Sequence, residues 1–452
     1  MSGPVLGIVA DDLSGSAECA AHALMRVSRS RVILSIDALP PSRAPHAAVD
    51  ADIDAVVTVD TDSRRLEAGD AVRAVRAAAA LVAGAPVVVK KVDSLLRGHV
   101  AAEVAALAEE LHRTPVVAVA NPALDRVVRD GVLHVGGTPL HRTDLWAVEP
   151  TAAPSRVAEA LHPLRTVLVP HTVVALGGDA VGDALAAAAG SGLVAVCDAV
   201  TEADLEVVHA AAVRATPEAL LVGSGALAAV AARALPRDPD GRPLDGGGPT
   251  PATDTARSLL FVLGTRAPGL PAQLTKLSAA HSAQTVLVRP DELLTDPEAV
   301  CVRLAELSRD GVAGVFVVAL DPTAPADPNR SRALTEALAD VVAPMLDRYD
   351  AAFLSGGETA RAVLDRLDVG SLEVLGEIGT GETGTGSVVS RRPGGRLVVT
   401  RPGSFGDPSS LARVAAHLRG APSTSPAPGA AQTTPTHTAT RAVHDATTEE
   451  NS

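Results

Sequence analysis

The sequence predicts an α/β protein with two domains, each a mostly parallel β-sheet flanked by helices. Three observations lead to this fold class. Short valine-rich runs alternate with alanine-rich stretches along both halves of the chain, a segment rich in proline and glycine separates the halves, and 452 residues that are 47% hydrophobic can bury more than one core. Continuous apolar runs followed by helical stretches indicate strands buried on both faces, which is typical of parallel sheets.

Residues 1–235 are predicted to form the first domain. Its candidate strands are eight short apolar runs: Leu6–Ala10, Arg31–Ser35, Ala55–Val59, Val87–Lys90, Val116–Ala120, Thr166–Val169, Leu193–Val196 and Leu220–Val222. Stretches of helical periodicity lie between them, such as Gly69–Val82 and Val100–His112. This alternation favours a parallel sheet, because parallel neighbours need a crossover connection that is usually a helix.

A linker and a second domain are predicted to follow. Residues 236–256 are rich in proline, glycine and aspartate and have no apolar periodicity, so they are predicted to be the linker. The second domain is predicted over residues 257–420, with strands at Leu259–Leu263, Thr285–Val288, Gly314–Ala319, Ala351–Leu354 and Arg396–Thr400. Residues 421–452 are rich in serine, threonine, proline and alanine and are predicted to be a disordered tail.

Composition excludes several classes of function. The net charge of −14 argues against a surface for nucleic acid, although a local basic pocket for a small anion is compatible with it. The three cysteines are far apart in the sequence, which indicates a reducing compartment and no zinc site. The first residues resemble a strand rather than a signal peptide, and no apolar run is long enough to cross a bilayer. We therefore predict a cytoplasmic protein that binds neither membrane nor nucleic acid.

Two adjacent lysines are the most informative local feature. Lys90 and Lys91 are two of only three lysines in the chain, and they end an apolar run. Asp93, Ser94 and Arg97 follow, before a glycine and a helical stretch. A cation, a carboxylate, a hydroxyl and a guanidinium at a strand end suit an anion site, whereas the simpler interpretation is a solvated strand end. Neighbouring strand residues point to opposite faces, so at most one lysine should reach such a site.

Other strand ends of the first domain carry similar side chains. Asp11 and Asp12 follow the first strand, Asp62 and Arg64 follow the third, and Arg126 lies beyond the fifth. The two aspartates suit either a helix cap or a base that accepts a hydroxyl proton. Since the carboxyl ends of parallel strands form the ligand-binding edge of a sheet, these residues predict a pocket for a small polyhydroxy acid.

The second domain is rich in glycine loops. Gly356, Gly357, Glu358 and Thr359 lie at a strand-to-helix turn, where backbone N–H groups can approach a phosphate. The glycine-rich segment 376–386 and the segment 401–406, which contains Gly403, are similar candidates, with plain turn geometry as the structural alternative. The segment 223–228 imitates a dinucleotide-binding fingerprint, but it lacks the downstream acid, so helix–strand packing is the favoured interpretation.

With these motifs in order, the chain resembles the four-carbon acid sugar kinases, which phosphorylate threonate, erythronate or 3-oxo-tetronate with ATP. The resemblance spans residues 6–418 and rests on five motifs: Ala10–Glu18, Asp60–Arg64, Lys90–Gly98, Ser355–Ala360 and Arg401–Gly406. It implies an amino-terminal domain that holds the sugar acid, a carboxyl-terminal domain that holds ATP, and an active site in the cleft between them.

The resemblance also implies site residues. Asp12, Lys91 and Asp93 are predicted to be catalytic, and the predicted substrate-binding residues are Asp11, Asp62, Arg64, Ser94, Arg97 and Arg126. The predicted ATP-binding residues are Thr265, Gly356, Gly357, Glu358, Thr359 and Gly403. Mg²⁺ is expected with ATP, although no ligand for it is identified. The chain departs from the family in its Gly264–Ala267 turn, in Leu95 for a usual threonine, and in Glu358 for a usual aspartate.

Two other functions remain open from the sequence. One is a nicotinamide-dependent oxidoreductase of a small hydroxy acid, which would use the segment 223–228 for its cofactor. The other is a regulator that binds a sugar acid or a nucleotide without turnover, which the altered Gly264–Ala267 turn suggests. A homodimer is compatible with the sequence, which does not fix the number of subunits.

Overall fold

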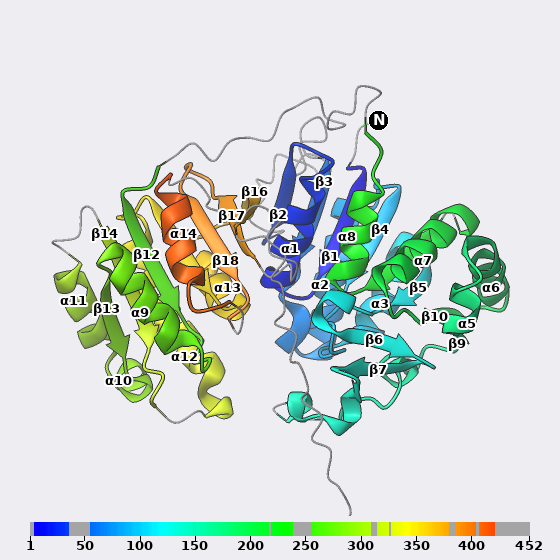
Figure 1. The fold of residues 1–452 in the computed structure, drawn as a ribbon, viewed down its shortest axis with the longest axis horizontal. Coiled ribbons are helices and arrows are strands. Elements are labelled where there is room, and N and C mark those ends of the chain that lie inside the picture. Colours follow the sequence, from blue (N-terminus) through cyan, green and yellow to red (C-terminus); the bar gives the residue numbers. More distant parts are fainter. Residues whose placement is uncertain are drawn as a thin grey trace, which may run out of the picture. The chain divides into compact units, whose positions relative to one another are not determined.

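The structure is a computed structural model that describes residues 4–35, 55–147, 149, 151–216, 218–237, 255–308, 314–324, 327–378, 386–403 and 406–420 (Figure 1). Most of the predicted linker 236–256 and all of the predicted tail 421–452 lie outside the described residues. So do residues 379–385 of the glycine-rich segment and the pair 404–405. Within the described ranges, no helix is long and apolar enough to cross a membrane.

All eight strands predicted in the first half are present, and they are parallel to one another. Their order in the sheet is β2-β3-β1-β4-β11-β5-β10-β9. Their bounds are β1 Leu6–Ala10, β2 Ser30–Ile33, β3 Val56–Asp60, β4 Val87–Lys91, β5 Thr114–Ala118, β9 Thr166–Val169, β10 Val194–Cys197 and β11 Ala219–Gly223. The register sets Ala10 of β1 opposite both Asp60 of β3 and Lys91 of β4, so the polar segments that follow these strands start at one level.

Helices cover this sheet. They are α1 Leu13–Ala23, α2 Ala68–Val82, α3 Val100–Leu111, α4 Val157–Ala160, α5 His171–Val174, α6 Gly178–Gly190, α7 Glu202–Ala215 and α8 Gly225–Arg233. The predicted helices Gly69–Val82 and Val100–His112 are confirmed as α2 and α3, which pack against each other. A second group of helices packs together, with α8 in contact with both α1 and α7.

A small antiparallel sheet, which the periodicity did not predict, supplies one side of the site. It consists of β6 Arg126–Arg129, β7 Val132–Val135 and β8 Thr138–Pro139. Asp130-Gly131 and Gly136-Gly137 form its two turns, and all four residues have positive φ. Asp-Gly and Gly-Gly pairs are strong hairpin signals, because both central residues of such a turn need the left-handed conformation. This sheet was therefore detectable from its turns.

The second half contains the five predicted strands in a parallel arrangement of order β13-β14-β12-β15-β18. They are β12 Ser258–Leu263, β13 Gln284–Val288, β14 Gly314–Leu320, β15 Ala351–Ser355 and β18 Leu397–Arg401. The accompanying helices are α9 Leu270–His281, α10 Pro290–Thr295, α11 Pro297–Leu307, α12 Ser331–Leu346, α13 Gly357–Arg366 and α14 Ser410–Leu418.

Two further strands join the halves, which the sequence had presented as separate sheets. β16 (Ser371–Ile378) and β17 (Ser387–Arg391) are antiparallel, and β16 also pairs antiparallel with β2. The result is one sheet of 15 strands across the described residues. The hydrophobic core follows the sheet: Leu13 and Ala17 of α1 belong to the same buried cluster as Val363 and Leu364 of α13. Helices α1 and α13 therefore pack into one shared hydrophobic core.

Candidate active site

One pocket of about 570 Å³ gathers nearly all the predicted site residues. Its lining comes from both halves of the chain and includes Asp12, Asp62, Arg64, Lys91, Asp93, Ser94, Arg97, Arg126, Thr265, Gly356, Gly357, Glu358, Thr359 and Gly403. Of the predicted set, Asp11 alone is absent from this lining, and it lies directly behind it, in contact with Arg64 and Lys91. The structure thus brings the predicted residues together, while their individual roles stay predictions.

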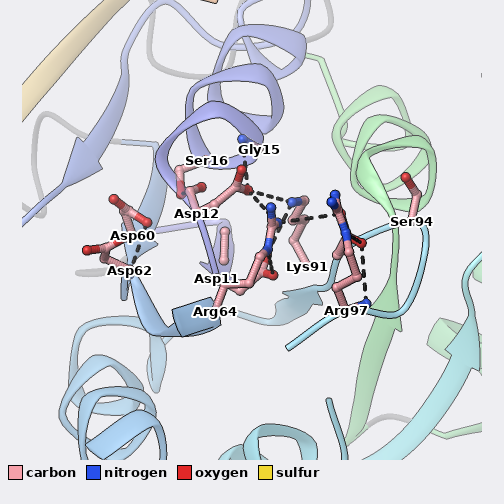
Figure 2. Close-up of polar contacts among 12 residues, drawn as sticks. Asp11, Asp12, Gly15, Ser16, Asp60, Asp62, Arg64, Lys91, Ser94 and Arg97 are labelled. Carbon is pink, nitrogen blue, oxygen red and sulfur yellow. Dashed lines mark hydrogen bonds and ion pairs between the residues drawn. The ribbon is translucent and has the colours of Figure 1, made fainter. Parts of the chain in front are cut away.

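Lys91 lies between the two aspartates that follow β1 (Figure 2). Its Nζ donates to Asp12 Oδ1 at 2.8 Å and to Asp11 Oδ1 at 3.2 Å. Burial alone would lower the pKa of Lys91, but the negative charges of Asp11 and Asp12 outweigh it and hold that pKa above its usual value. Lys91 therefore keeps its positive charge at any physiological pH.

Asp12 and Gly15 shape the start of α1 around this lysine. Asp12 is the N-cap of the helix and accepts the Gly15 N–H at 3.2 Å. A Cβ at Gly15 would overlap the Lys91 ammonium group, so a side chain at this position would displace the lysine. The capping interpretation of the aspartate pair is thus correct for Asp12, which also faces the pocket.

Arg64 ties three carboxylates together. Its Nε donates to Asp11 Oδ2 at 2.8 Å, and its Nη2 lies 3.1 Å from Asp12 Oδ1 and 3.7 Å from Asp93 Oδ1. Burial would raise the pKa of Asp11, but the charges of Arg64 and Lys91 outweigh it and hold that pKa well below its usual range. Asp11 is therefore a permanent counter-ion, which orients both cations from behind the pocket.

Asp93 and Arg97 neutralise each other in a tight turn. Arg97 donates from Nε to Asp93 Oδ2 at 2.7 Å and from Nη2 to Asp93 Oδ1 at 2.9 Å. Burial would raise the pKa of Asp93, but the hydrogen bond from Arg97 and the charge of Arg64 lower it to about 2. The turn needs positive φ at Leu96 and Gly98, 63° and 87°. A carboxylate held in this way is a poor proton acceptor.

Arg126 differs from Arg64 and Arg97. Its Nη1 donates to Ser94 Oγ, and its Nε is buried without a hydrogen-bond partner in the described part of the chain. Within those same ranges it makes no ion pair with a carboxylate, whereas Arg64 and Arg97 both do. Burial lowers the pKa of Arg126 from its usual value. A guanidinium nevertheless stays protonated in proteins.

Two neighbouring aspartates, Asp60 and Asp62, follow one another at the end of β3 (Figure 2), and Asp62 lines the pocket. Asp60 is buried, accepts Arg361 Nη1 at 2.8 Å and also accepts the backbone N–H of Asp62 at 3.2 Å. Burial raises the pKa of Asp60 to about 6, against the opposing charge of Arg361. Although Asp62 is exposed to the pocket, desolvation by the surrounding protein and the charge of Asp60 raise its pKa to about 7. This corner carries more negative charge than its cations offset.

Glycines line the opposite side, at the first turn of α13. Gly356 has a φ of 101°, which side-chain-bearing residues rarely adopt. A Cβ at Gly264 would overlap the Thr359 hydroxyl, and a Cβ at Gly403 would come within 3.0 Å of Thr265 Cβ. Three backbone segments thus approach one another closely here. The amino terminus of α13 at this point favours an anion.

Two family models match the chain: a sugar-binding N-terminal domain over residues 6–231 and a nucleotide-binding C-terminal domain over residues 260–411. The chain is 31% identical over 417 residues to D-threonate kinase from Cupriavidus necator, which covers 89% of this chain and 95% of the relative. The chain belongs to the four-carbon acid sugar kinase family. The resemblance inferred from its motifs is therefore confirmed.

Other members of the family and a solved structure extend this finding. The chain is 28% identical over 428 residues to 3-oxo-tetronate kinase from Methylobacterium radiotolerans, which covers 89% of this chain and 96% of the relative. A crystallised protein from Salmonella typhimurium LT2 shares the fold, with a TM-score of 0.71, 20% identity, and coverage of 90% of this chain and 98% of the other. At that identity the structural likeness speaks for the fold alone.

Two of the departures from the family motifs, in the Gly264–Ala267 turn and at Glu358, make local contacts. In the Gly264–Ala267 turn, Thr265 Oγ1 accepts the Ala267 N–H at 3.2 Å, so the hydroxyl that remains still closes the turn. Glu358 forms an ion pair with Arg65, Oε1 to Nε 2.8 Å. Although its sequence differs from the family motif, this turn keeps its internal hydrogen bond, and Gly264 and Thr265 line the pocket.

Gly223 has a packing role, as the sequence favoured. A Cβ there would overlap the carbonyl oxygen of Ala118 on the neighbouring strand and lie 2.6 Å from Leu227 Cδ2. Close approach of α8 to the sheet therefore explains this glycine without a dinucleotide.

Sequence reasoning missed several functional neighbours. Ser14, Arg65, Leu145 and Gly225 line the pocket, and Arg361 grips Asp60 from α13. Ser14, Arg65 and Gly225 stand in or beside motifs already singled out, so proximity to those motifs was a usable signal. Arg361 carried none, because an arginine inside an amphipathic helix is usually a surface residue.

Proposed function

We propose that the chain is an ATP-dependent kinase that phosphorylates the terminal 4-hydroxyl of a four-carbon sugar acid, with D-threonate the first substrate to test. One observation carries the proposal beyond family membership: a single pocket joins a charged side around Lys91 to a glycine-lined side at the amino terminus of α13. A small acid with hydroxyl groups suits the first side, and a triphosphate suits the second. In this proposal the active site is the cleft between the sugar-binding and nucleotide-binding domains.

Arg126 is the residue proposed to bind the substrate carboxylate. Arg64 and Arg97 already serve protein carboxylates, whereas the charge of Arg126 is unpaired within the described residues. Ser94, which shares a hydrogen bond with Arg126, lines the same part of the pocket. A guanidinium and a hydroxyl together match the planar, two-oxygen geometry of a carboxylate.

Lys91 and Asp12 are proposed to act at the reacting hydroxyl. Phosphoryl transfer forms a bond from the 4-hydroxyl oxygen to the γ-phosphorus of ATP and breaks the bond to the β–γ bridging oxygen, so that ADP leaves. The hydroxyl proton must pass to an acceptor. Asp12 uses Oδ1 for Gly15, Arg64 and Lys91, and its Oδ2 makes no polar contact in the described part of the chain. That oxygen is the proposed acceptor, and the Lys91 charge stabilises the moving phosphoryl group.

Asp93 takes a different place in this proposal. Its carboxylate is fully used by Arg97 and by the backbone N–H of Leu95, and its pKa is about 2. It is therefore proposed to orient the Arg97 turn and Arg64 instead of accepting the hydroxyl proton. Asp12, one of the three residues predicted to be catalytic, is then the proposed base.

ATP is proposed to place its phosphates at the first turn of α13. Gly356 and Gly357 give the backbone access that phosphate oxygens need, and the Thr359 hydroxyl lies beside Gly264. Ser14, at the start of α1, lies close to Gly357, so the first turns of α1 and α13 face one region. Two positive helix ends beside Lys91 provide the charge that a triphosphate requires.

Mg²⁺ fits this pocket only as an ion held largely by phosphate and water. Among the described residues, no three His, Cys, Asp or Glu side chains form a metal-binding group. Asp62 is a carboxylate whose pKa is raised by desolvation and by neighbouring negative charge, which a bound cation would relieve. Asp62, with Glu358 nearby in the lining, is therefore proposed to face the ion, whose charge would offset that of the phosphates.

The test is an ATP-consumption screen of the purified full chain with D-threonate, D-erythronate and their 3-oxo forms, with phosphorus NMR to locate the new phosphate. The expected result is ADP formation with one of these acids and a 4-phosphate product. Lys91→Met is expected to abolish turnover, because it removes the cation without adding bulk beside Gly15. Absence of ADP formation with every acid tested would refute the proposal.

The two alternatives predict different results from calorimetric titration. An oxidoreductase should bind NAD, although close packing is sufficient to explain Gly223 in its candidate motif. A regulator without turnover should bind the sugar acid and ATP and yield no ADP. Tight binding of ATP, no binding of NAD and a phosphorylated product would together favour the kinase.

A further inference from the structure

Lys90, the second lysine of the pair, does not reach the pocket. Its side chain is fully buried, and its Nζ lies 2.6 Å from Oε2 of Glu103, which is 2% exposed and belongs to the first turn of α3. Burying two charges costs desolvation free energy that their mutual attraction often fails to offset. An apolar pair would fill this space more simply. The presence of a charged pair beneath the site therefore calls for a physical role.

The pair is the centre of a buried hydrogen-bond network. Ser63 Oγ donates to Glu103 Oε1 at 2.8 Å. Thr61 Oγ1 lies 2.8 Å from Ser63 Oγ but spends its own proton on the Ala10 carbonyl, so the hydrogen-bonded chain ends at Ser63. Lys90 Nζ also donates to the carbonyl of Lys91 at 3.2 Å. Ser63 and Lys90 are both fully buried, so water does not compete for these contacts. The network joins the end of β4 and the segment that follows β3 to α3.

Each end of the network adjoins a charged residue of the pocket. Ser63 directly precedes Arg64, and the carbonyl that accepts from Lys90 belongs to Lys91 itself. These are the residues whose contacts of 2.8 and 3.2 Å hold the cations in place. A displacement of either backbone segment would change the distance between cation and carboxylate.

Building on the proposed kinase function, we propose that Lys90 and Glu103 are a positioning pair for phosphoryl transfer. They touch neither substrate nor ATP. They fix the backbone of Lys91 and, through Ser63, the segment that carries Arg64, so that both cations meet the developing charge of the transition state. Small errors in such placement are costly, since a shift of about 1 Å lowers rates by about 10²-fold.

A neutral replacement separates positioning from simple stability. The double variant Lys90→Met/Glu103→Leu removes both charges and keeps similar volume, and such replacements of buried ion pairs are often neutral or stabilising. Its melting temperature is expected to equal or exceed that of the wild type. Its kcat for the sugar acid is expected to fall about 10²-fold, with the KM for ATP unchanged, because the ATP-side residues lie outside the network. A crystal structure should show that Arg64 has moved away from Asp11.

A second comparison covers the case in which the double variant fails to fold. Ser63→Ala breaks the link from Glu103 to the Arg64 segment and leaves the ion pair intact. Its kcat is expected to fall by about tenfold. Ser258→Ala is the matched control: Ser258 is also buried and hydrogen-bonded, to the Asp350 N–H, but it begins β12 at the end remote from the pocket. Its kcat should not change.

The outcomes distinguish this inference from the proposed function. A folded double variant, or Ser63→Ala, with wild-type kcat and an unmoved Arg64 overturns the positioning role and leaves the kinase intact. A wild-type chain that phosphorylates no four-carbon acid refutes the kinase. In that case the crystal structure of the double variant decides whether the pair positions Arg64, since that measurement needs no activity.

Discussion

Replacing Arg126 with methionine should remove the preference of the enzyme for an acid over the matching neutral polyol. Arg126 is the pocket arginine whose charge no carboxylate of the described residues neutralises, and its Nε is buried without a partner there. A hydrogen bond to a charged group contributes about 1.5–3 kcal/mol. Since about 1.4 kcal/mol corresponds to a factor of ten, kcat/KM for D-threonate should fall by about 10- to 100-fold.

The assay compares two acceptors that differ only at C1. ADP release is measured by a coupled assay with D-threonate and with D-threitol, for the wild type and for Arg126→Met. The methionine keeps the aliphatic bulk of the side chain, so the slow reaction with the polyol should be unchanged while the reaction with the acid slows.

Arg97→Met is the control for losing any pocket arginine. It deprives Asp93 of its main partner, so the pKa of Asp93 should rise from about 2, and kcat should fall for both acceptors alike. The preference for the acid should survive. An Arg126→Met enzyme that still discriminates fully between threonate and threitol would show that the carboxylate binds elsewhere, and loss of discrimination in Arg97→Met would point to Arg97.

Three further predictions concern the other sides of the pocket. Gly264→Ala should raise the KM for ATP at least tenfold, because its Cβ would overlap Thr359, whereas Gly84→Ala, with open space around its Cβ, should behave as wild type in the same assay. The pKa of Asp62 is about 7, so kcat/KM should fall as the pH drops below that value and the carboxylate gains a proton. A pH–rate profile of Asp62→Asn should lack this fall. In the wild type, a higher Mg²⁺ concentration should shift the fall in kcat/KM to lower pH. Arg361→Gln should lower the free energy of unfolding, measured by denaturant titration, by about 3–5 kcal/mol, because it leaves the buried carboxylate of Asp60 unpaired. Arg366→Gln on the same helix breaks the exposed pair with Asp340 and should lower it by less than about 1 kcal/mol.

Local sequence was sufficient for the fold class, and the predicted site residues, whose roles stay predictions, nearly all line one pocket. The apolar runs Leu6–Ala10 and Val87–Lys90 are strands because continuous valine-rich segments suit a sheet buried on both faces. Once the strands are parallel, their carboxyl ends share one edge, so Asp12, Arg64 and Lys91 had to lie near one another. The same reasoning correctly predicted that Lys90 and Lys91 would separate, because alternate residues of a strand face opposite sides.

The strands β16 and β17 show where this reasoning stopped. They pair antiparallel, and the pairing of β16 with β2 turns two expected sheets into one. Local patterns report which segments are strands, but the partner of an edge strand depends on which other edge the folded chain brings beside it. Nothing in the sequence around Ser371–Ile378 states that its neighbour is Ser30–Ile33.

The sequence by itself determined which chemical groups the pocket would contain, because secondary structure and strand direction are set by neighbouring residues. Tertiary structure alone decided which charged side chains form ion pairs with one another and which remain available to a ligand. Asp60 and Arg361 form an ion pair although they are 301 residues apart in the sequence. Lys90 of β4 pairs with Glu103 of α3, and Arg126 pairs with no carboxylate of the described residues. Ion pairing depends on distances of a few ångströms through space, and those distances exist only when the chain has folded.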